Sequence, residues 1–153
     1  MELVFEYRGL HLHIDAMERP YFEAAAAGRL AVQACVDCGT ARYPPTPRCL
    51  ACGSAKYVWQ DTNGQGRVYS CLIVEHGVRE AFPAPYAIGL VELDHIPPAR
   101  PEYAVRILSM ILEAGSGDAT VRDPVPDGTP VEVCFRPLAD GYALPHFRIA
   151  GGS

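Results

Sequence analysis

Cys35-Val-Asp-Cys-Gly39 and Cys49-Leu-Ala-Cys-Gly53 are two copies of one short motif, and a proline-rich connector of ten residues, 39–48, separates the two pairs of cysteines. Two residues between cysteines is the spacing at which one tight turn directs both sulfurs to a single point, and four thiolates suit the tetrahedral coordination that zinc prefers. The glycine after each pair permits the positive φ that such a turn tends to need. Because four protein ligands leave no open coordination position, the motifs predict a closed, structural zinc site.

Short regular elements are expected on both sides of the motifs. Pro20 suits the first position of a helix and Gly28 suits its end, so the sequence predicts a helix of about two turns over residues 20–27. Strands over residues 30–33 and 56–60 would lead into and out of the motifs and complete a zinc ribbon. Residues 1–14 alternate loosely and are expected to form an extended arm.

After residue 66 the chain becomes rich in strand-like runs. Clusters of proline, glycine or aspartate separate five such runs, over residues 67–76, 86–93, 102–112, 131–137 and 142–149. Five short strands without convincing helices between them favour a small antiparallel barrel, of which the oligonucleotide/oligosaccharide-binding (OB) fold is one form and other small barrels are alternatives. In the fourth run the alternation places the thiol of Cys134 on the outward face. Residues 114–127 are expected to be a mobile surface loop.

Composition and charge disfavour several classes of protein. An apolar content of 49% over 153 residues is ample for the core of one domain or two small ones. The formal net charge is −5, and the 13 Lys and Arg residues are scattered without a run of three, which disfavours nucleic acid as the main partner. Residues 1–12 lack the apolar run of a signal peptide, and no stretch approaches the roughly 20 apolar residues that cross a bilayer. We therefore expect a cytoplasmic protein with reduced thiols.

No set of catalytic residues is recognisable. The sequence contains no Gly-x-Ser-x-Gly, no His-Glu-x-x-His and no phosphate-binding loop. Cys71 and Cys134 are most simply unreactive thiols, because the sequence shows no base beside either of them. The histidines fall in separate segments, and none adjoins a serine or cysteine in a known nucleophile motif: His11, His13, His76, His95 and His146. We predict no catalytic residue in this chain.

The order of helix, cysteine motifs and strands resembles the zinc-ribbon OB-fold family first catalogued as a domain of unknown function, DUF35. The similarity extends over residues 18–149. The residues that carry it are Pro20-Tyr-Phe-Glu23, Gly28-Arg-Leu30, the two cysteine motifs, Tyr43-Pro-Pro45, Gly64-Gln-Gly66-Arg-Val-Tyr69, Pro85-Tyr86, Gly128-Thr-Pro-Val-Glu-Val133 and Pro145-His-Phe147. Pattern and resemblance together predict a mainly β chain with an N-terminal arm and short helix (residues 1–30), a rubredoxin-like zinc ribbon (31–62) and a C-terminal five-stranded OB-fold barrel (63–153).

The resemblance also implies a function. Members of this family are similar to accessory subunits of thiolase-superfamily enzymes: thiolases, acyltransferases, and aldolases that act on acyl-CoA, including in steroid side-chain degradation. The implied role is a non-catalytic subunit of a hetero-oligomer, with one structural Zn2+ held by Cys35, Cys38, Cys49 and Cys52 and acyl-CoA at or near the shared interface. The alternatives are a single-stranded nucleic-acid-binding module, a stand-alone acyl-CoA binder and a redox protein with iron at the four cysteines.

Two further sets of residues are candidates for contacts with the partner and with CoA. Tyr21 and Phe22 are aromatic anchors on a helix with little polar surface, which packs either on its own chain or on a thiolase-like subunit. Arg42, Arg48 and Lys56 flank the ribbon, and their positive charge suits the phosphate groups of CoA.

Overall fold

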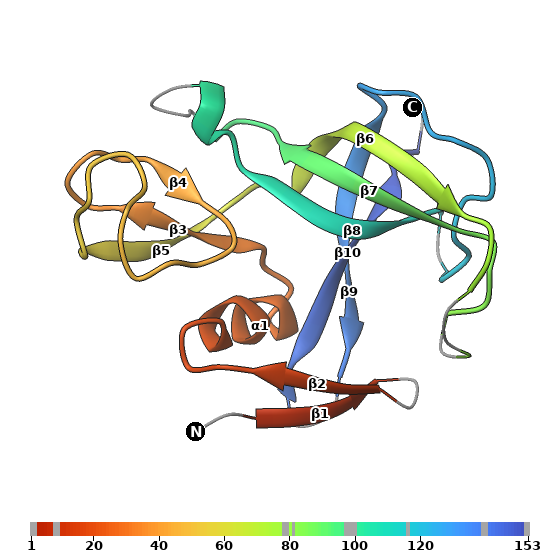
Figure 1. The fold of residues 1–153 in the computed structure, drawn as a ribbon, viewed down its shortest axis with the longest axis horizontal. Coiled ribbons are helices and arrows are strands. Elements are labelled where there is room, and N and C mark those ends of the chain that lie inside the picture. The colour runs from red at the N-terminus through yellow and green to blue at the C-terminus, as the bar shows by residue number, and fades with distance from the viewer. Residues whose placement is uncertain are drawn as a thin grey trace.

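The computed structural model of the protein describes residues 3–7, 10–77, 80, 82–96, 101–115, 117–138 and 141–151. These residues form an N-terminal hairpin, one α-helix, a three-stranded ribbon sheet and a closed five-stranded barrel (Figure 1). The predicted mainly β fold, with a ribbon followed by an OB-fold barrel, is confirmed.

The N-terminal strands β1 (Leu3–Tyr7) and β2 (Leu10–Ile14) pair with each other in an antiparallel hairpin. Figure 1 shows this hairpin beside the helix. The side chain of Ile14 is only 1% exposed, so the end of β2 is packed against the rest of the chain. The described part of residues 1–14 is extended, as expected, and its two strands pair in a hairpin, which was not predicted.

Helix α1 (Arg19–Ala26) begins one residue earlier than predicted and ends at a glycine turn. Pro20 lies in the first turn, where its missing N–H removes no helical hydrogen bond. The backbone N–H groups of Gly28 (φ 73°) and Arg29 donate to carbonyls of the last turn at 3.0 and 2.9 Å, which satisfies the helix end. Neither α1 nor any other helix in the described ranges combines the length and apolar character of a membrane span.

The ribbon sheet contains three antiparallel strands in the order β4-β3-β5. These are β3 (Ala31–Cys35), β4 (Ala41–Arg42) and β5 (Tyr57–Asp61). The strands predicted at residues 30–33 and 56–60 are confirmed with shifts of one or two residues. The two-residue strand β4 was not predicted, because so short a segment carries no periodic pattern.

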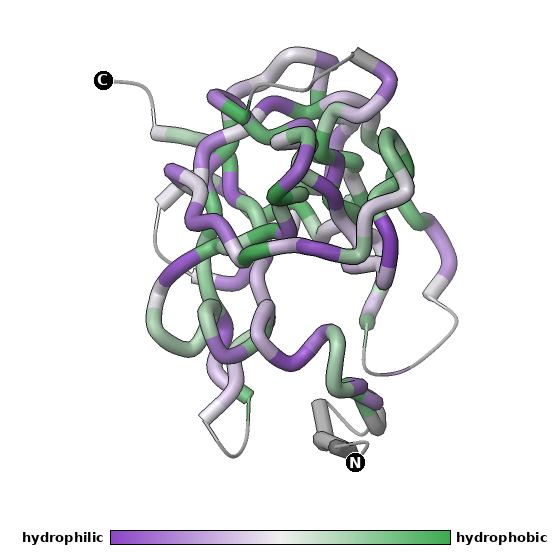
Figure 2. Tube along the Cα trace, turned by 90° about the vertical axis from the view of Figure 1, so that its left-hand side faces the viewer, coloured by the Kyte–Doolittle hydropathy of each residue, from purple (hydrophilic) through white to green (hydrophobic). Residues whose placement is uncertain are grey.

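The barrel closes in the order β10-β8-β7-β6-β9, and its β8–β10 pair is parallel while the other pairs are antiparallel. All five predicted strands are confirmed within a few residues, as β6 (Gln65–Val74), β7 (Tyr86–Leu93), β8 (Arg106–Leu112), β9 (Pro130–Pro137) and β10 (Ala143–Ile149). The third run starts later than predicted because Pro101–Tyr103 form a single 3-10 turn. Buried and half-buried positions alternate along β7, and Figure 2 shows hydrophobic and hydrophilic residues interspersed along the chain.

Two valines anchor the connection between β8 and β9 to the core. Val121 and Val125 are 6% and 7% exposed and belong to the main hydrophobic core. The hydroxyl of Thr120 accepts the backbone N–H of Ala87 at 3.0 Å and donates to the carbonyl of Ile111 at 2.9 Å. The segment 114–127 is mostly exposed, as expected of a surface loop, but Val121 and Val125 anchor it to the core, which was not predicted.

Cys134 lies on β9 with its thiol half-buried. The side chain was predicted to face outward, and its Sγ lies 3.6 Å from the carbonyl oxygen of His146 on the neighbouring strand β10. Val131, Val133 and Phe135 lie in or against the core and Cys134 does not, so the predicted outward face of β9 agrees with the structure, although the thiol is half-buried.

The helix, the ribbon and the barrel share one hydrophobic core. Tyr21 from α1 and Val32 from β3 belong to the same cluster of buried side chains as Val131 and Phe147 from the barrel. The backbone also links the parts, since the N–H of Thr62 donates to the carbonyl of Leu30 at 2.8 Å. The position of the ribbon on the barrel is therefore fixed by buried contacts as well as by the covalent connection.

Candidate metal centre

The four cysteines of the two motifs meet at one end of the ribbon. Cys35 ends β3 and Cys38 lies in the turn after it, whereas Cys49 and Cys52 lie in the turn that precedes β5. All four sulfurs lie within 4.8 Å of one another, and the Cys35–Cys52 and Cys38–Cys49 sulfur pairs are both 3.6 Å apart. Sulfurs about 2.3 Å from a tetrahedral metal are separated by about 3.8 Å, so this donor set fits a metal ion. The ribbon therefore contains a metal site.

The two turns that carry the cysteines have the same backbone geometry. Gly39 and Gly53 have φ angles of 75° and 77°. The N–H of Gly39 donates to the carbonyl of Cys35 at 2.9 Å, and the N–H of Gly53 donates to the carbonyl of Cys49 at 2.8 Å. Because other residues rarely adopt this φ, the glycine after each motif explains how each pair of sulfurs converges.

Hydrogen bonds around the sulfurs favour thiolates. The backbone N–H of Cys38 lowers the pKa of Cys35. The hydroxyl of Thr40, 3.3 Å from Sγ of Cys38, lowers the pKa of that thiol to about 6. At Cys52 the backbone N–H of Ser54 favours the thiolate, but the nearby sulfurs outweigh it and raise the pKa to about 12. Thiolates this close repel one another, so all four ionise only when a metal replaces the remaining protons.

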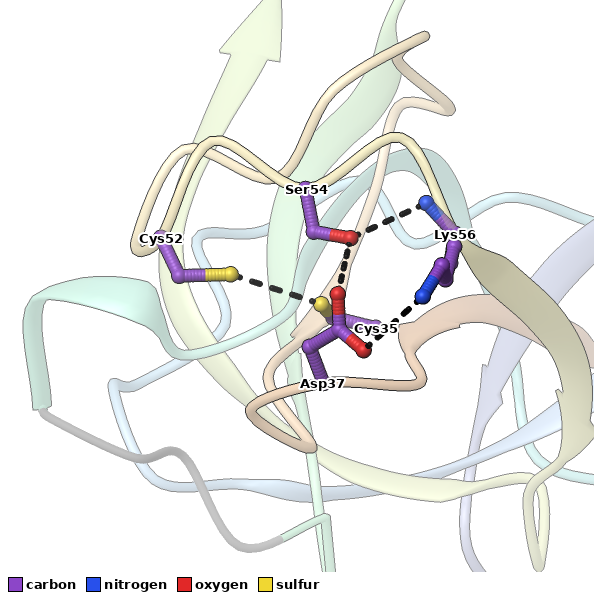
Figure 3. Close-up of polar contacts among 5 residues, drawn as sticks. All are labelled: Cys35, Asp37, Cys52, Ser54 and Lys56. Atoms are coloured by element: carbon purple, nitrogen blue, oxygen red, sulfur yellow. Dashed lines mark hydrogen bonds and ion pairs between the residues drawn. The ribbon is translucent and has the colours of Figure 1, made fainter.

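A small polar network joins the two turns on the surface of the site (Figure 3). The hydroxyl of Ser54 donates to Asp37 at 2.6 Å and accepts the backbone N–H of Lys56 at 3.1 Å. The ammonium of Lys56 lies 3.9 Å from Asp37, and its side chain is 75% exposed. Arg48 is exposed and donates to the carbonyl of Gly53 at 3.1 Å. These contacts connect the first motif to the second through side chains.

Arg42 lies inside the ribbon, unlike Arg48 and Lys56. Its side chain is 7% exposed, and its Nη2 donates to the carbonyl of Thr46 in the connector at 3.0 Å. Gln33, fully buried on β3, accepts the backbone N–H of Thr46 at 2.9 Å. The three candidate CoA-binding residues therefore do not gather on one surface, since two are exposed and one is covered by the connector.

Gln33 was not singled out from the sequence. Its role as a buried acceptor for the connector depends on how the connector folds over the sheet. The signal available was a single polar residue within the otherwise apolar run Ala31-Val-Gln-Ala-Cys35. Such a residue, when buried, needs a hydrogen-bond partner.

Tyr21 and Phe22, the candidate partner contacts, differ in how far this chain buries them. The ring of Tyr21 is 4% exposed and packs against Tyr43 of the connector at a centroid distance of 5.0 Å. Burial, together with Tyr43, raises the pKa of Tyr21 well above its ordinary value. Phe22 contacts Tyr21 edge-to-face at 5.2 Å and is half-buried. The structure thus places Tyr21 in the core and leaves part of Phe22 accessible.

A four-cysteine metal ribbon that shares its core with a closed five-stranded barrel defines a two-part class of ribbon and OB-fold proteins. The family model described as ChsH2, rubredoxin-like zinc ribbon domain, matches residues 22–58. The model described as ChsH2, C-terminal OB-fold domain, matches residues 59–136. The chain belongs to this ChsH2 family. A similar solved chain is described by both the ChsH2 and the DUF35 names, so the predicted family membership is confirmed.

Similar solved structures cover nearly the whole chain. A chain of a structure described as the Ltp2-ChsH2(DUF35) aldolase is 31% identical, with a TM-score of 0.71 over 89% of this chain and 96% of that chain. A DUF35 protein of unknown function from Sulfolobus solfataricus is 15% identical, with a TM-score of 0.51 over 90% of this chain and 86% of that chain, and supports the fold alone.

One curated relative is much longer than this chain. A probable enoyl-CoA hydratase alpha subunit from Thermomonospora curvata is 44% identical over 73 residues, which are 48% of this chain. The chain spans only 23% of the length of that relative. The similarity therefore concerns a part of a larger protein.

Proposed function

We propose that this chain is a non-catalytic, cytoplasmic accessory subunit that binds a thiolase-superfamily enzyme and supports the formation or cleavage of carbon–carbon bonds in acyl-CoA substrates. One observation carries the proposal: the chain is 31% identical, over almost its whole length, to a chain of the Ltp2-ChsH2(DUF35) aldolase. That description names two proteins in one aldolase, which supports a hetero-oligomer here.

The metal in this proposal is one structural Zn2+ per chain. Four cysteine sulfurs surround the site, so no position remains for a substrate or a water molecule when all four bind. Zinc is chosen over iron because the family model that matches the ribbon is described as a zinc ribbon. When bound, such an ion supplies folding energy and no redox chemistry.

Two surfaces are assigned to the partner and to CoA. Phe22, which is half-buried, forms the accessible aromatic part of helix α1, and this side of the helix with the adjoining ribbon contacts the enzyme subunit. Arg48 and Lys56 are exposed beside the metal site and contact CoA phosphates. Arg42, as a third phosphate contact, requires the connector to move away from its side chain.

The test of the function is reconstitution with the thiolase-like protein that co-purifies from the native host. Cleavage and formation of carbon–carbon bonds in acyl-CoA should require the complex, and the purified chain alone should give no turnover. Turnover by the chain alone, or a co-purifying partner without a thiolase fold, would contradict the proposal.

Variants separate the two surfaces. Replacing both Arg48 and Lys56 by glutamine should raise the KM for acyl-CoA in the complex about tenfold, whereas Arg122→Gln, an exposed change outside the ribbon, should not. Phe22→Ala should weaken assembly about tenfold if Phe22 is a central anchor, with zinc content unchanged. Intact assembly in Phe22→Ala would show that the partner interface does not depend on Phe22.

A further inference from the structure

Arg42 is a buried cation without an anionic partner in the described part of the chain. Its side chain is 7% exposed, and its Nε and Nη1 atoms are buried without a hydrogen-bond partner. None of the ion pairs among the described residues includes it. Arginine does not lose its proton in proteins, so the charge remains. A buried charge is unfavourable unless an opposite charge lies nearby.

The side chain of Arg42 lies on the face of the ribbon that carries the metal site. Arg42 is directly opposite Gln33, and Gln33 precedes Cys35 by two residues, so all three side chains start from one face of the sheet. The guanidinium carbon lies 5.5 Å from the ring centroid of Tyr57. Tyr57 is the residue directly opposite Cys35 on β5. The guanidinium therefore lies over the ring of the residue that pairs with the first cysteine of the metal site.

A small cavity gives a second, independent link between Arg42 and the metal site. The cavity has a volume of about 130 Å³, and Arg42, Thr40 and Cys49 all contribute to its wall. The exposed Glu102 also lines the cavity, but no ion pair among the described residues joins it to Arg42. Cys49 is a metal ligand, and the hydroxyl of Thr40 lies 3.3 Å from Sγ of another ligand, Cys38. Arg42 thus approaches both cysteine motifs.

We propose that Arg42 is the counter-charge of the four-cysteine metal centre and strengthens metal binding by electrostatic attraction. A divalent ion with four thiolates has a net charge of about −2, which supplies the anion that Arg42 lacks. Lys56 and Arg48 are also close to the motifs, but they are exposed, so water and salt screen their charges. This inference rests on the metal site of the proposed function and adds a role for a buried residue in it.

A purely mechanical role is the competing explanation. Arg42 and Gln33 both hold Thr46, one through its carbonyl and one through its N–H, so either residue could act only by fixing the connector. The counter-charge role and the mechanical role predict that different variants lose metal affinity. If charge matters, Arg42→Gln is defective and Arg42→Lys is not. If only the connector matters, Arg42→Lys and Gln33→Met are as defective as Arg42→Gln.

The first experiment measures the dissociation constant of Zn2+ in the full-length protein by competition with a chelator at fixed pH. Arg42→Gln should weaken Zn2+ binding about tenfold or more, and Arg42→Lys should stay within about threefold of wild type. Gln33→Met should have a smaller effect than Arg42→Gln. Equal loss in Arg42→Lys and Arg42→Gln would overturn the inference, as would wild-type affinity in Arg42→Gln.

The second experiment tests the effect of the Arg42 charge through the reduction potential of the metal centre. In protein substituted with iron, the centre has a net charge of about −1 as Fe3+ and −2 as Fe2+, so a nearby cation favours the reduced form. The reduction potential should become more negative in Arg42→Gln and should remain close to wild type in Arg42→Lys. An unchanged potential in Arg42→Gln would overturn the inference, because a change in connector packing alone predicts no such sign.

The variants also distinguish this inference from the proposed function. If wild-type protein binds no Zn2+, the proposed metal is wrong, whatever Arg42 does. If wild type binds Zn2+ and Arg42→Gln binds it equally well, only the counter-charge is wrong. Should Arg42→Gln fail to fold, Arg42→Lys still decides, since charge predicts near wild-type affinity and the connector role predicts a loss equal to that of Gln33→Met.

Discussion

In the ribbon, strand β5 exposes Val58 to 54% and Tyr57 to 36%, whereas in the barrel Ala87, Ile111 and Phe147 are fully buried. The ribbon sheet has two open edges, while every strand of the barrel pairs on both sides. A sheet of three short strands buries too little apolar surface to be stable alone and usually needs a metal or another staple. The difference indicates that one chain uses two sources of stability, metal coordination in the ribbon and apolar burial in the barrel.

The two sources of stability overlap where the ribbon meets the barrel. Leu30 and Val32 at the start of the ribbon are 2% and 0% exposed and belong to the same core as the barrel. Loss of the metal should therefore affect the two motifs and β5 first, while the inner end of β3 remains packed. Variants that destabilise one part test this division, because it is wrong if the destabilisation extends to the other part.

The largest expected effect is that of metal loss. Cys38→Ser removes one of the four ligands, and because structural zinc contributes about 10 kcal/mol or more to folding of such units, the ribbon should unfold around the two motifs. Amide hydrogen exchange should show loss of protection in β5 and the turns, with protection retained in the barrel strands. Cys134→Ser, a half-buried thiol outside the cluster, is the matched control and should change neither zinc content nor exchange.

The opposite outcomes would be informative. Full protection of the ribbon in metal-free Cys38→Ser would show that the shared core alone holds it. Loss of protection throughout the barrel would show that the chain unfolds as one unit, and the division into two sources of stability would then be wrong.

The second effect is the removal of a large side chain from the barrel. Phe147 on β10 is fully buried, so Phe147→Ala should lower the free energy of unfolding by about 3–5 kcal/mol. Urea unfolding of the zinc-bound protein measures this change. Leu108→Ala, at a position that is 66% exposed, should cost less than about 1 kcal/mol. Similar losses in the two variants would mean that the barrel interior is not the main source of stability.

Gly66, at the start of β6, allows a smaller, sterically defined test. A Cβ on Gly66 would lie 2.6 Å from the carbonyl oxygen of Glu92 and 2.7 Å from a methyl group of Val91. Gly66→Ala should therefore force β6 and β7 apart and destabilise the barrel by about 2 kcal/mol. Gly151→Ala, where a Cβ would meet nothing, is the control. Thermal unfolding of both variants decides, and unchanged stability of Gly66→Ala would show that the two strands separate easily.

Much of this architecture could be predicted from the sequence because its signals are local. The cysteine spacing and the following glycines predicted a site whose four sulfurs the structure brings together. The five barrel strands were predicted because breakers bound each run, and only their ends differ by a few residues. Spacing and breakers act within one turn or one strand, so a single sequence displays them.

The parts that were missed depend on tertiary contacts. Val121 and Val125 are isolated among glycine, proline and aspartate, so no periodicity announced their burial. The pairing of β1 with β2 was not predicted, because the sequence around it contains no Asn-Gly or Asp-Gly hairpin signal. Arg42 was a candidate contact for CoA phosphates, and its burial, with a hydrogen bond to the carbonyl of Thr46, depends on how the residues after β4 fold back. From the sequence, the short apolar helix could pack on its own chain or on a partner subunit. The structure shows that its Tyr21 lies in the core of this chain.

The smallest expected effect concerns the contact between the helix end and the ribbon. Arg29, just after α1, and Asp61, at the end of β5, form an ion pair at 2.5 Å, with both side chains 54% exposed. Exposed pairs of this kind contribute about 0.5 kcal/mol and are weakened by salt. Asp61→Asn should therefore lower the free energy of unfolding by about that amount at low salt and by less at high salt. Asp94→Asn, which removes the half-buried partner of the exposed Arg67 at 3.7 Å, is the control and should also have a small effect. If Asp61→Asn instead costs several times more than Asp94→Asn and also lowers zinc affinity, then the ribbon depends on its polar contact with the helix end, and metal coordination is not its main source of stability.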